Sequence, residues 1–212
     1  GKSTLMKVLF GVEKPEEGRI LLHGKEVHID NPNMAIQMGI GMVYQHFMLV
    51  PSLTVAENLV IGMEPRKNRF FFDMDKAVQM VKETAEKYNF QIDPMARICD
   101  LPVGQKQKVE ILKVLLRGAK IVILDEPTAV LTPQETRELF VELKGLREQG
   151  HTVIFISHKL NEVTELCDRV TVMRAGTTVG MMDIKGISES DISRMMVGRD
   201  IILKIDKEKS EH

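Results

Sequence analysis

The chain has 212 residues, enough to bury one sizeable core, and its 43% hydrophobic and 28% charged residues are ordinary for a globular domain. Its 29 basic and 30 acidic residues give a net charge of -1, which argues against a nucleic-acid partner. No apolar run reaches the roughly 20 residues of a membrane helix, and the first residues are no signal peptide, so we expect any membrane role to go through a partner.

Apolar, β-rich runs alternate with helical patterns, which predicts an α/β fold with a mostly parallel sheet covered by helices. The predicted strands are residues 19–22, 41–44, 121–124, 152–156 and 169–173. Strand patterns stop between Asp73 and Gly118, where helical spacing and a second predicted helix over 105–117 indicate a helical insertion at about 73–117. We therefore expect one domain over 1–203 and a charged tail or linker over 204–212.

The clearest predicted helix follows Thr132. Pro133 suits the first helical position, Glu135 completes a capping box with Thr132, and Gly150 ends the pattern. One face of this helix is apolar and is formed by Leu139, Phe140, Leu143 and Leu146. Cys99 and Cys167 lie far apart without metal-ligand spacing, and we expect two buried free thiols.

The first four residues, Gly1, Lys2, Ser3 and Thr4, precede an apolar helical run and match the end of a P-loop. In such a loop, backbone N–H groups and a helix N-terminus hold phosphates, Lys reaches the β/γ-phosphates and Ser binds Mg²⁺. We expect the loop's glycines and the first strand of the core to lie upstream of Gly1. The alternative is a chance tetrapeptide that opens a helix.

A buried apolar strand over 121–124 leads into Asp125 and Glu126. In a P-loop enzyme this is where an Asp orients the Mg²⁺ shell and a second acid polarises water. A buried strand followed by a solvated acidic turn is the alternative. The carboxyl end of a strand in an open α/β sheet favours the ligand site.

With these motifs in order, the sequence resembles the ATPase subunits of ABC transporters from Gly1 to about Gly198. Gln45 matches the Q-loop, Asp125 and Glu126 the Walker B pair, and His158 the switch histidine. The signature loop, usually Leu-Ser-Gly-Gly-Gln, is matched by Leu101, Pro102, Val103, Gly104 and Gln105. The stretches 110–113 and 128–135 resemble importers of simple sugars and, more closely, of nucleosides, whose ATPase subunits carry two such cassettes. This chain would be the first.

The resemblance implies a RecA-like P-loop NTPase with an inserted ABC helical subdomain, which hydrolyses ATP with Mg²⁺ as cofactor. Glu126 would activate the attacking water, His158 would contact the γ-phosphate, and Gln45 would complete the metal shell with Ser3 and Asp125. The nucleotide would be held by Gly1, Lys2, Ser3, Thr4 and Gln45, and on the facing cassette by Leu101, Gly104 and Gln105. The implied partners are a second cassette, membrane permease subunits and, indirectly, a substrate-binding protein, at the cytoplasmic face of the plasma membrane.

Three departures from the family pattern concern the signature and the loop after Walker B. Pro102 stands in place of a Ser whose hydroxyl and N–H would face the partner's γ-phosphate, and proline supplies neither donor. Val103 replaces a Gly, and Thr132 replaces an Asp. A nucleotide-responsive regulatory cassette with little turnover is therefore an alternative to the importer ATPase. A third interpretation, an ABC protein acting on DNA or ribosomes, is disfavoured by the near-neutral charge.

The methionines on either side of Gln45 leave two interpretations open. Met42 and Met48 could belong to an adaptable partner-binding surface, but Met at strand and helix spacing is more often core filler.

Overall fold

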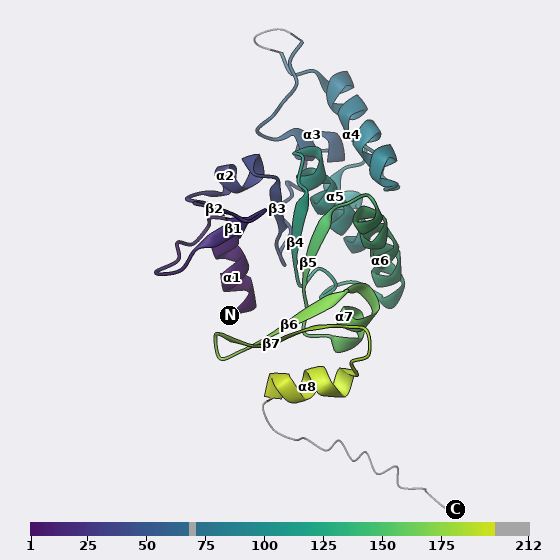
Figure 1. The fold of residues 1–212 in the computed structure, drawn as a ribbon. Coiled ribbons are helices and arrows are strands. Elements are labelled where there is room, and N and C mark those ends of the chain that lie inside the picture. The colour runs from purple at the N-terminus through teal and green to yellow at the C-terminus, as the bar shows by residue number, and fades with distance from the viewer. Residues whose placement is uncertain (68–70, 198–212) are drawn as a thin grey trace, which may run out of the picture. The chain divides into compact units, whose positions relative to one another are not determined.

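A computed structural model describes residues 1–67 and 71–197. They form two compact units, one comprising Lys2–His158 and the other Gly1 with the chain from Lys159 onward, and each unit is described by itself (Figure 1). The predicted tail over 204–212 and the end of the predicted domain over 1–203 lie outside the described residues. Among the described helices, none has both the length and the apolar character needed to cross a bilayer.

The centre of the first unit is a three-stranded parallel sheet in the order β3-β4-β5. Strand β3 is Ile40–Val43, β4 is Ile121–Asp125 and β5 is Thr152–Ile156. In register, Val43 lies opposite Leu124, and Asp125 lies opposite Ile156. The expected α/β fold with a parallel sheet flanked by helices is thereby confirmed.

Side chains of the sheet alternate between two covered faces, as strand geometry requires. On one face, Ile40, Met42, Ile123 and Ile156 pack in a core cluster with Phe10, Ile29 and Ala35. On the other face, the Phe155 ring packs edge-on to the Phe140 ring of α6 (Pro133–Glu148), with centroids 5.9 Å apart. Because β4 is covered on both faces and paired along both edges, Val122, Ile123 and Leu124 are fully buried.

Helices α1 (Lys2–Leu9) and α2 (Pro32–Gln37) lie on one side of the sheet, and α5 (Val103–Leu116) and α6 on the other (Figure 1). Between β3 and β4 the chain also forms α3 (Val55–Val60), α4 (Met74–Tyr88) and a 3₁₀ turn, η1 (Ile98–Asp100). No strand occurs in the described part of 73–117, which agrees with the predicted helical insertion; its status as a separate subdomain stays a prediction.

Two of the five predicted strands lie in antiparallel pairs and not in the parallel sheet. The run at 19–22 forms β1 (Ile20–Leu22), which pairs with β2 (Lys25–Val27). The run at 169–173 forms β6 (Arg169–Arg174), which pairs with β7 (Thr177–Asp183). A glycine follows the first strand of each pair closely, at Gly24 and Gly176, and both have the positive φ that a tight reversal requires.

In the second unit, α8 (Glu189–Val197) packs against α7 (Leu160–Leu166) and the β6–β7 pair. Ile192 of α8 is buried there, and Arg174 donates a hydrogen bond to the carbonyl oxygen of Met195.

The helix predicted after Thr132 is confirmed in detail. Thr132 is its N-cap with both capping-box hydrogen bonds in place, Pro133 opens the helix, and Gln149 and Gly150 end it. The predicted apolar face is the buried one.

The predicted burial of the cysteines is wrong, although both thiols are free. Cys99 is exposed because Ile98 supplies the buried side chain of the 3₁₀ turn, while the Cys99 sulfur points to the Asp100 carboxylate. Cys167 is partly exposed at the C-cap of α7.

Strand β3 approaches α5 so closely that only glycine fits at position 41. A methyl group there would lie 2.7 Å from Cβ of Val114 and 2.9 Å from Cβ of Ala119.

We predict that Gly41→Ala destabilises the fold by about 1–3 kcal/mol through overpacking. The control is Gly145→Ala inside α6, where an added Cβ would have no neighbour within 4 Å, and which should be neutral or stabilising by up to ~1 kcal/mol. Equal melting temperatures of the two variants would contradict this.

His151 is buried between the end of α4 and the start of β5. Its ring stacks edge-on against Tyr88 with centroids 5.3 Å apart, and within the described structure its Nδ1 is buried without a hydrogen-bond partner. Burial, and then the nearby Lys120 charge, lowers the pKa of His151, while its hydrogen bond to the Ala119 backbone acts in the opposite direction. The folded chain therefore holds this imidazole neutral.

We predict that His151 makes the fold acid-sensitive. The unfolded chain binds this proton more readily, so stability is full above the ordinary histidine pKa of about 6.5 and is lost as pH falls from there toward the lowered folded value. Melting temperatures between pH 7.5 and 5.5 should fall less steeply in His151→Gln than in wild type. The exposed His28→Gln is the control and should keep the wild-type slope.

Candidate functional site

Three chain segments emerge at the same edge of the parallel sheet. Gln45 lies two residues beyond the end of β3, Glu126 directly follows β4, and His158 lies two residues beyond β5. Because the three strands are parallel and in register, their carboxyl ends coincide, which is where open α/β sheets bind ligands.

The first turn of α1 reaches this edge from a distant part of the sequence. Ser3 Oγ donates a hydrogen bond of 2.9 Å to Oδ1 of Asp125, across 122 residues of chain. Lys2, Ser3 and Thr4 form the start of the helix, whose free N–H groups and dipole favour an anion. The hydroxyl and carboxylate are hard oxygen donors of the kind that Mg²⁺ prefers, so these two residues fit that cation.

Glu126 and His158 are in direct contact. His158 Nδ1 lies 2.9 Å from Oε2 of Glu126, with 64% of the His158 side chain and 16% of the Glu126 side chain exposed. The carboxylate is thus mostly shielded while the imidazole reaches solvent, an arrangement that could hold and orient a water molecule.

Glu126 also has an unusual backbone. Its φ of 49° lies in the left-handed region, which non-glycine residues rarely adopt. Its N–H donates to the Ile156 carbonyl oxygen, so β5 fixes the turn. Strain of this kind concentrates at functional sites, where surrounding structure maintains it.

The loop after Gln45 is fixed by polar side chains of two helices. Glu110 accepts a hydrogen bond from the Met48 N–H, and Lys113 donates one of 3.4 Å to the Met48 carbonyl oxygen. Asn58 accepts from the Val50 N–H and donates to its carbonyl oxygen, at 2.7 and 3.0 Å. The path of the loop is therefore fixed at Met48 and at Val50.

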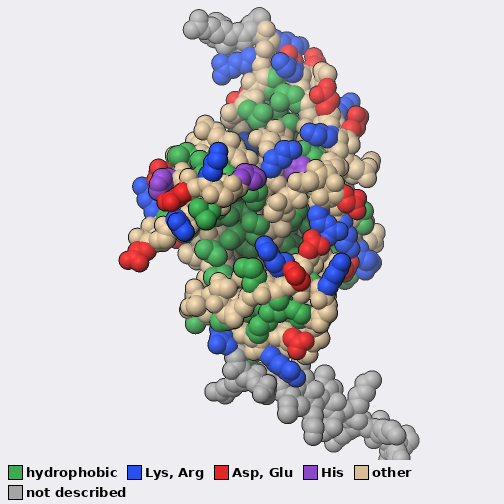
Figure 2. Space-filling model, in the orientation of Figure 1, with side chains coloured by type: hydrophobic (Ala, Val, Ile, Leu, Met, Phe, Trp, Pro, Cys, Tyr) green, Lys and Arg blue, Asp and Glu red, His purple; other side chains and the backbone are tan. Residues whose placement is uncertain are grey.

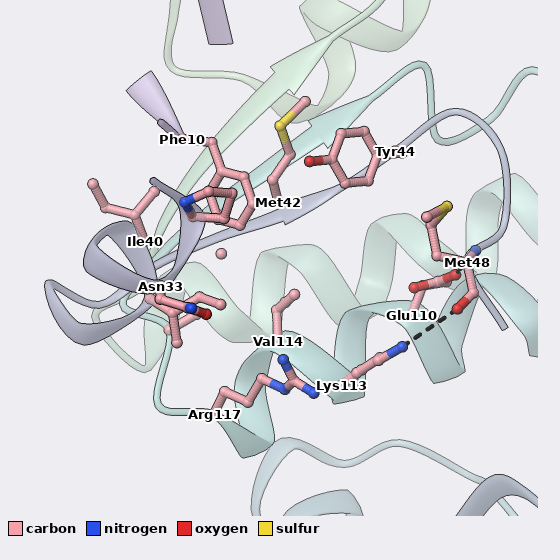
Figure 3. Close-up of a pocket in the computed structure, with 14 residues that line it drawn as sticks. Phe10, Asn33, Ile40, Met42, Tyr44, Met48, Glu110, Lys113, Val114 and Arg117 are labelled. Carbon is pink, nitrogen blue, oxygen red and sulfur yellow. Dashed lines mark hydrogen bonds between the residues drawn. The ribbon is translucent and has the colours of Figure 1, made fainter. Parts of the chain in front are cut away.

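A pocket of about 300 Å³ lies beside this loop, along the edge strand β3. Phe10, Met42 and Tyr44 line one side of the pocket, and Glu110, Lys113 and Val114 of α5, with Arg117 at its C-cap, line the other (Figure 3). Burial raises the pKa of Glu110 and lowers that of Lys113. Figure 2 shows one face of the molecule in the orientation of Figure 1. Hydrophobic side chains gather in the middle of that face, and basic and histidine side chains lie at their border.

The predicted signature residues form the entry to α5. Leu101 follows the 3₁₀ turn, Pro102 is the N-cap, and Gly104 and Gln105 lie in the first turn. Pro102 makes no side-chain cap hydrogen bond. The Gly104 N–H is instead bound by Glu135 Oε1 of α6, at 3.0 Å.

The family model described as ABC transporter matches residues 1–129, which is more than half of the chain. The chain belongs to the ABC transporter family. This agrees with the resemblance drawn from the motifs.

Curated relatives are similar to the chain over nearly its whole length. A guanosine import ATP-binding protein of Bacillus subtilis, NupO, is 48% identical over 100% of this chain and 41% of its own. A nucleoside import ATP-binding protein of Lactococcus lactis, NupA, is 45% identical over 95% and 40%. A glucose import ATP-binding protein of Haloferax volcanii is 44% identical over 99% and 43%. The chain thus spans about two fifths of the length of these relatives.

Solved ABC cassettes share the fold. The structure of cbiO1 from Clostridium perfringens, part of the ABC transporter complex cbiONQ, superposes with a TM-score of 0.72 at 30% identity, covering 87% of this chain and 73% of that one. An ATP-binding cassette of an ABC transporter in its ADP conformation gives 0.76 at 26% identity, covering 92% and 78%.

The structure brings some predicted site residues together and leaves others apart. Ser3 contacts Asp125, and Glu126 contacts His158, while Gln45 is placed at the same sheet edge by register and is exposed. Gly104 contacts Glu135 of α6, and Leu101 and Gln105 lie next to it in the chain at the start of α5, away from these two pairs in sequence.

Sequence reasoning missed the contacts of Glu110 and Lys113 with Met48. It also assigned Glu135 only to its own helix cap and not to the Gly104 N–H. The available signal was the proline at the N-cap of α5, which cannot cap with its own side chain and leaves the helix in need of another acceptor.

Proposed function

We propose that this chain is an ATP-binding and ATP-hydrolysing cassette that energises an importer of nucleosides or simple sugars. The observation that carries the proposal is the Glu126–His158 contact beside the Ser3–Asp125 hydrogen bond, at one edge of a parallel sheet. The relatives named for guanosine, nucleoside and glucose import support the substrate class. Their names give no support to a regulatory cassette with little turnover.

The nucleotide would bind at the start of α1, with Lys2 and the helix N–H groups toward its phosphates. Ser3 and Asp125 would hold Mg²⁺ with Gln45, and the cation would supply charge neutralisation at the β- and γ-phosphates. Mg²⁺ commonly binds proteins through one or two carboxylates plus phosphates, which agrees with the few donors present.

Glu126 would accept a proton from the attacking water or orient it, and His158, held by Glu126, would contact the γ-phosphate. A positioned general base is worth roughly 10²–10⁴ in rate. A second cassette would close head to tail over the nucleotide and contribute its own signature residues, while this chain's Leu101, Gly104 and Gln105 would face the partner's ATP.

The pocket beside Met48 would receive a cytoplasmic segment of the permease, with the cassette bound peripherally to the membrane. Met48 is 64% exposed at the pocket, whereas Met42 is 5% exposed and packs in the core, so the two methionines have different roles. The pocket combines an apolar floor with Glu110, Lys113 and Arg117, which suits an amphipathic helix with a polar edge. A substrate-binding protein would act through the permease.

We predict that Glu126→Gln in the complete protein lowers turnover at least about a hundredfold, because the isosteric amide keeps the shape but cannot accept the proton. Mg-ATP binding, measured by calorimetry, should stay within a few-fold of wild type. The exposed Glu13→Gln serves as a charge-matched control and should hydrolyse ATP normally. Turnover of Glu126→Gln close to wild type would remove Glu126 from the catalytic role.

We predict that Met48→Glu weakens co-purification of the complete protein with its permease, because it places a charge on an exposed apolar contact. Its basal ATP hydrolysis should be unchanged. Met95→Glu, at a methionine of similar exposure (53%), is the control. If both variants retain the permease equally, the pocket is not its docking site.

A further inference from the structure

The N-terminus of α5 lacks a cap of its own. Pro102 at the N-cap makes no side-chain hydrogen bond, and no acidic residue occurs in the first turn. The first N–H groups of a helix need acceptors, which Ser, Thr, Asp or Asn usually provide from the N-cap position.

Glu135 of the neighbouring helix α6 supplies the missing acceptor. Its Oε1 accepts from the Gly104 N–H at 3.0 Å, while its Oε2 accepts from the N–H and the hydroxyl of Thr132, both at 2.9 Å. These hydrogen bonds, Thr132 first, lower the pKa of Glu135, so the group on the α5 N-terminus is a carboxylate anion at neutral pH.

The carboxylate lies directly on the backbone of Gly104. A Cβ at this position would be 2.7 Å from Glu135 Oε1 and 2.9 Å from its Cγ, so only glycine leaves room for the contact. Any other anion that binds the Gly104 N–H must therefore move Glu135 first. Two anions cannot share one N–H at this distance without strong repulsion.

Helix α5 does not depend on Glu135 alone for its attachment to α6. One helical turn further on, Lys108 Nζ lies 2.8 Å from Glu142 Oε1 and 3.6 Å from Glu138 Oε2. The Lys108 and Glu142 side chains are only 9% and 10% exposed. The Lys108 contacts can hold the two helices together while the Glu135 side chain swings away.

We propose that Glu135 is an intramolecular anion cap on Gly104 which the γ-phosphate of ATP on a facing cassette must displace, so that Glu135 sets the ATP concentration at which two cassettes close. The proposal rests on the proposed function, in which the signature residues face the partner's nucleotide. Glu135 also caps α6, the helix that follows the Asp125–Glu126 loop. Displacement of the Glu135 side chain would therefore also affect the cassette's own site.

The test is Glu135→Gln in the complete protein, which keeps the size of the side chain and removes its charge. The ATP concentration for half-maximal closure, followed by a distance probe between cassettes, should fall roughly three- to tenfold, because a neutral amide is a weaker competitor for the N–H. The maximal turnover should change less than this. The control is Glu148→Gln, which removes an exposed carboxylate from the far end of α6 and should leave the ATP concentration for half-maximal closure unchanged. An unchanged or higher half-maximal concentration in Glu135→Gln, with a native melting temperature, would overturn the proposal.

A second variant guards against a folding defect in Glu135→Gln. Pro102→Ser provides an N-cap hydroxyl while Glu135 stays in place, and it should also lower the ATP concentration for closure. Because both changes act on one helix end, their effects should be less than additive in the double variant. Additive effects would mean that Glu135 and Pro102 act independently, contrary to the proposal.

Hydrogen exchange separates this proposal from the proposed function. Without nucleotide, the peptide that contains Gly104 should exchange at least threefold faster in Glu135→Gln than in wild type, whether or not the protein hydrolyses ATP. Equal exchange would overturn the cap. A wild-type protein that never closes on Mg-ATP would overturn the proposed function and the competition with phosphate, while leaving the exchange result intact.

Discussion

The pairing of β4 between two parallel strands is the constraint on which the rest of the site depends. Val122, Ile123 and Leu124 are fully buried, so a register slip of one residue would turn each of them to the wrong face and is strongly disfavoured. The register in turn fixes Asp125 and Glu126 at the point where the strand leaves the core, with Ile156 opposite Asp125. The chemistry of the edge is thus a consequence of apolar packing behind it.

The sequence predicts those parts of the fold that depend on local pattern. The strand that ends in Asp125, and the helix opened by Thr132, carry their signals within a few neighbouring residues, and both are confirmed. The pairing of the run at 19–22 with β2 could not be predicted, because strand periodicity does not name a partner. The Ser3–Asp125 contact likewise joins residues 122 positions apart, and family resemblance, not spacing, made it expected. Helix α3 was missed although Thr54 and Glu57 form a capping box that the sequence spells out.

Helix α5 connects two surfaces that the proposed function assigns to different partners. Near its end, Glu110 and Lys113 bind both backbone groups of Met48, which borders the pocket. At its start, the Gly104 N–H donates to Glu135, and in the proposed function this helix end would face the nucleotide of a second cassette. A helix of 14 residues moves as a nearly rigid body, so a shift at either end is carried to the other. The buried Glu110 connects this helix to the Gln45 loop through a hydrogen bond. Hydrogen bonds depend more strongly on the relative orientation of the two groups than apolar contacts do.

Pro102 and Glu135 are best understood as one feature. A proline can stand at an N-cap because the conformation required there, with φ of -63° and ψ of 160°, lies within its range, but it contributes no acceptor. The cost of leaving a buried Gly104 N–H without a partner is offset by Glu135, which is already fixed by Thr132. A signature without Ser is therefore not a defect of this fold, since the helix end is satisfied within the cassette. In the proposed pair of cassettes its consequence would fall on the facing nucleotide, which would meet a helix end that already holds an anion, while Glu126 and His158 keep their contact. Two ATP sites built from one such signature and one ordinary signature would be chemically unequal.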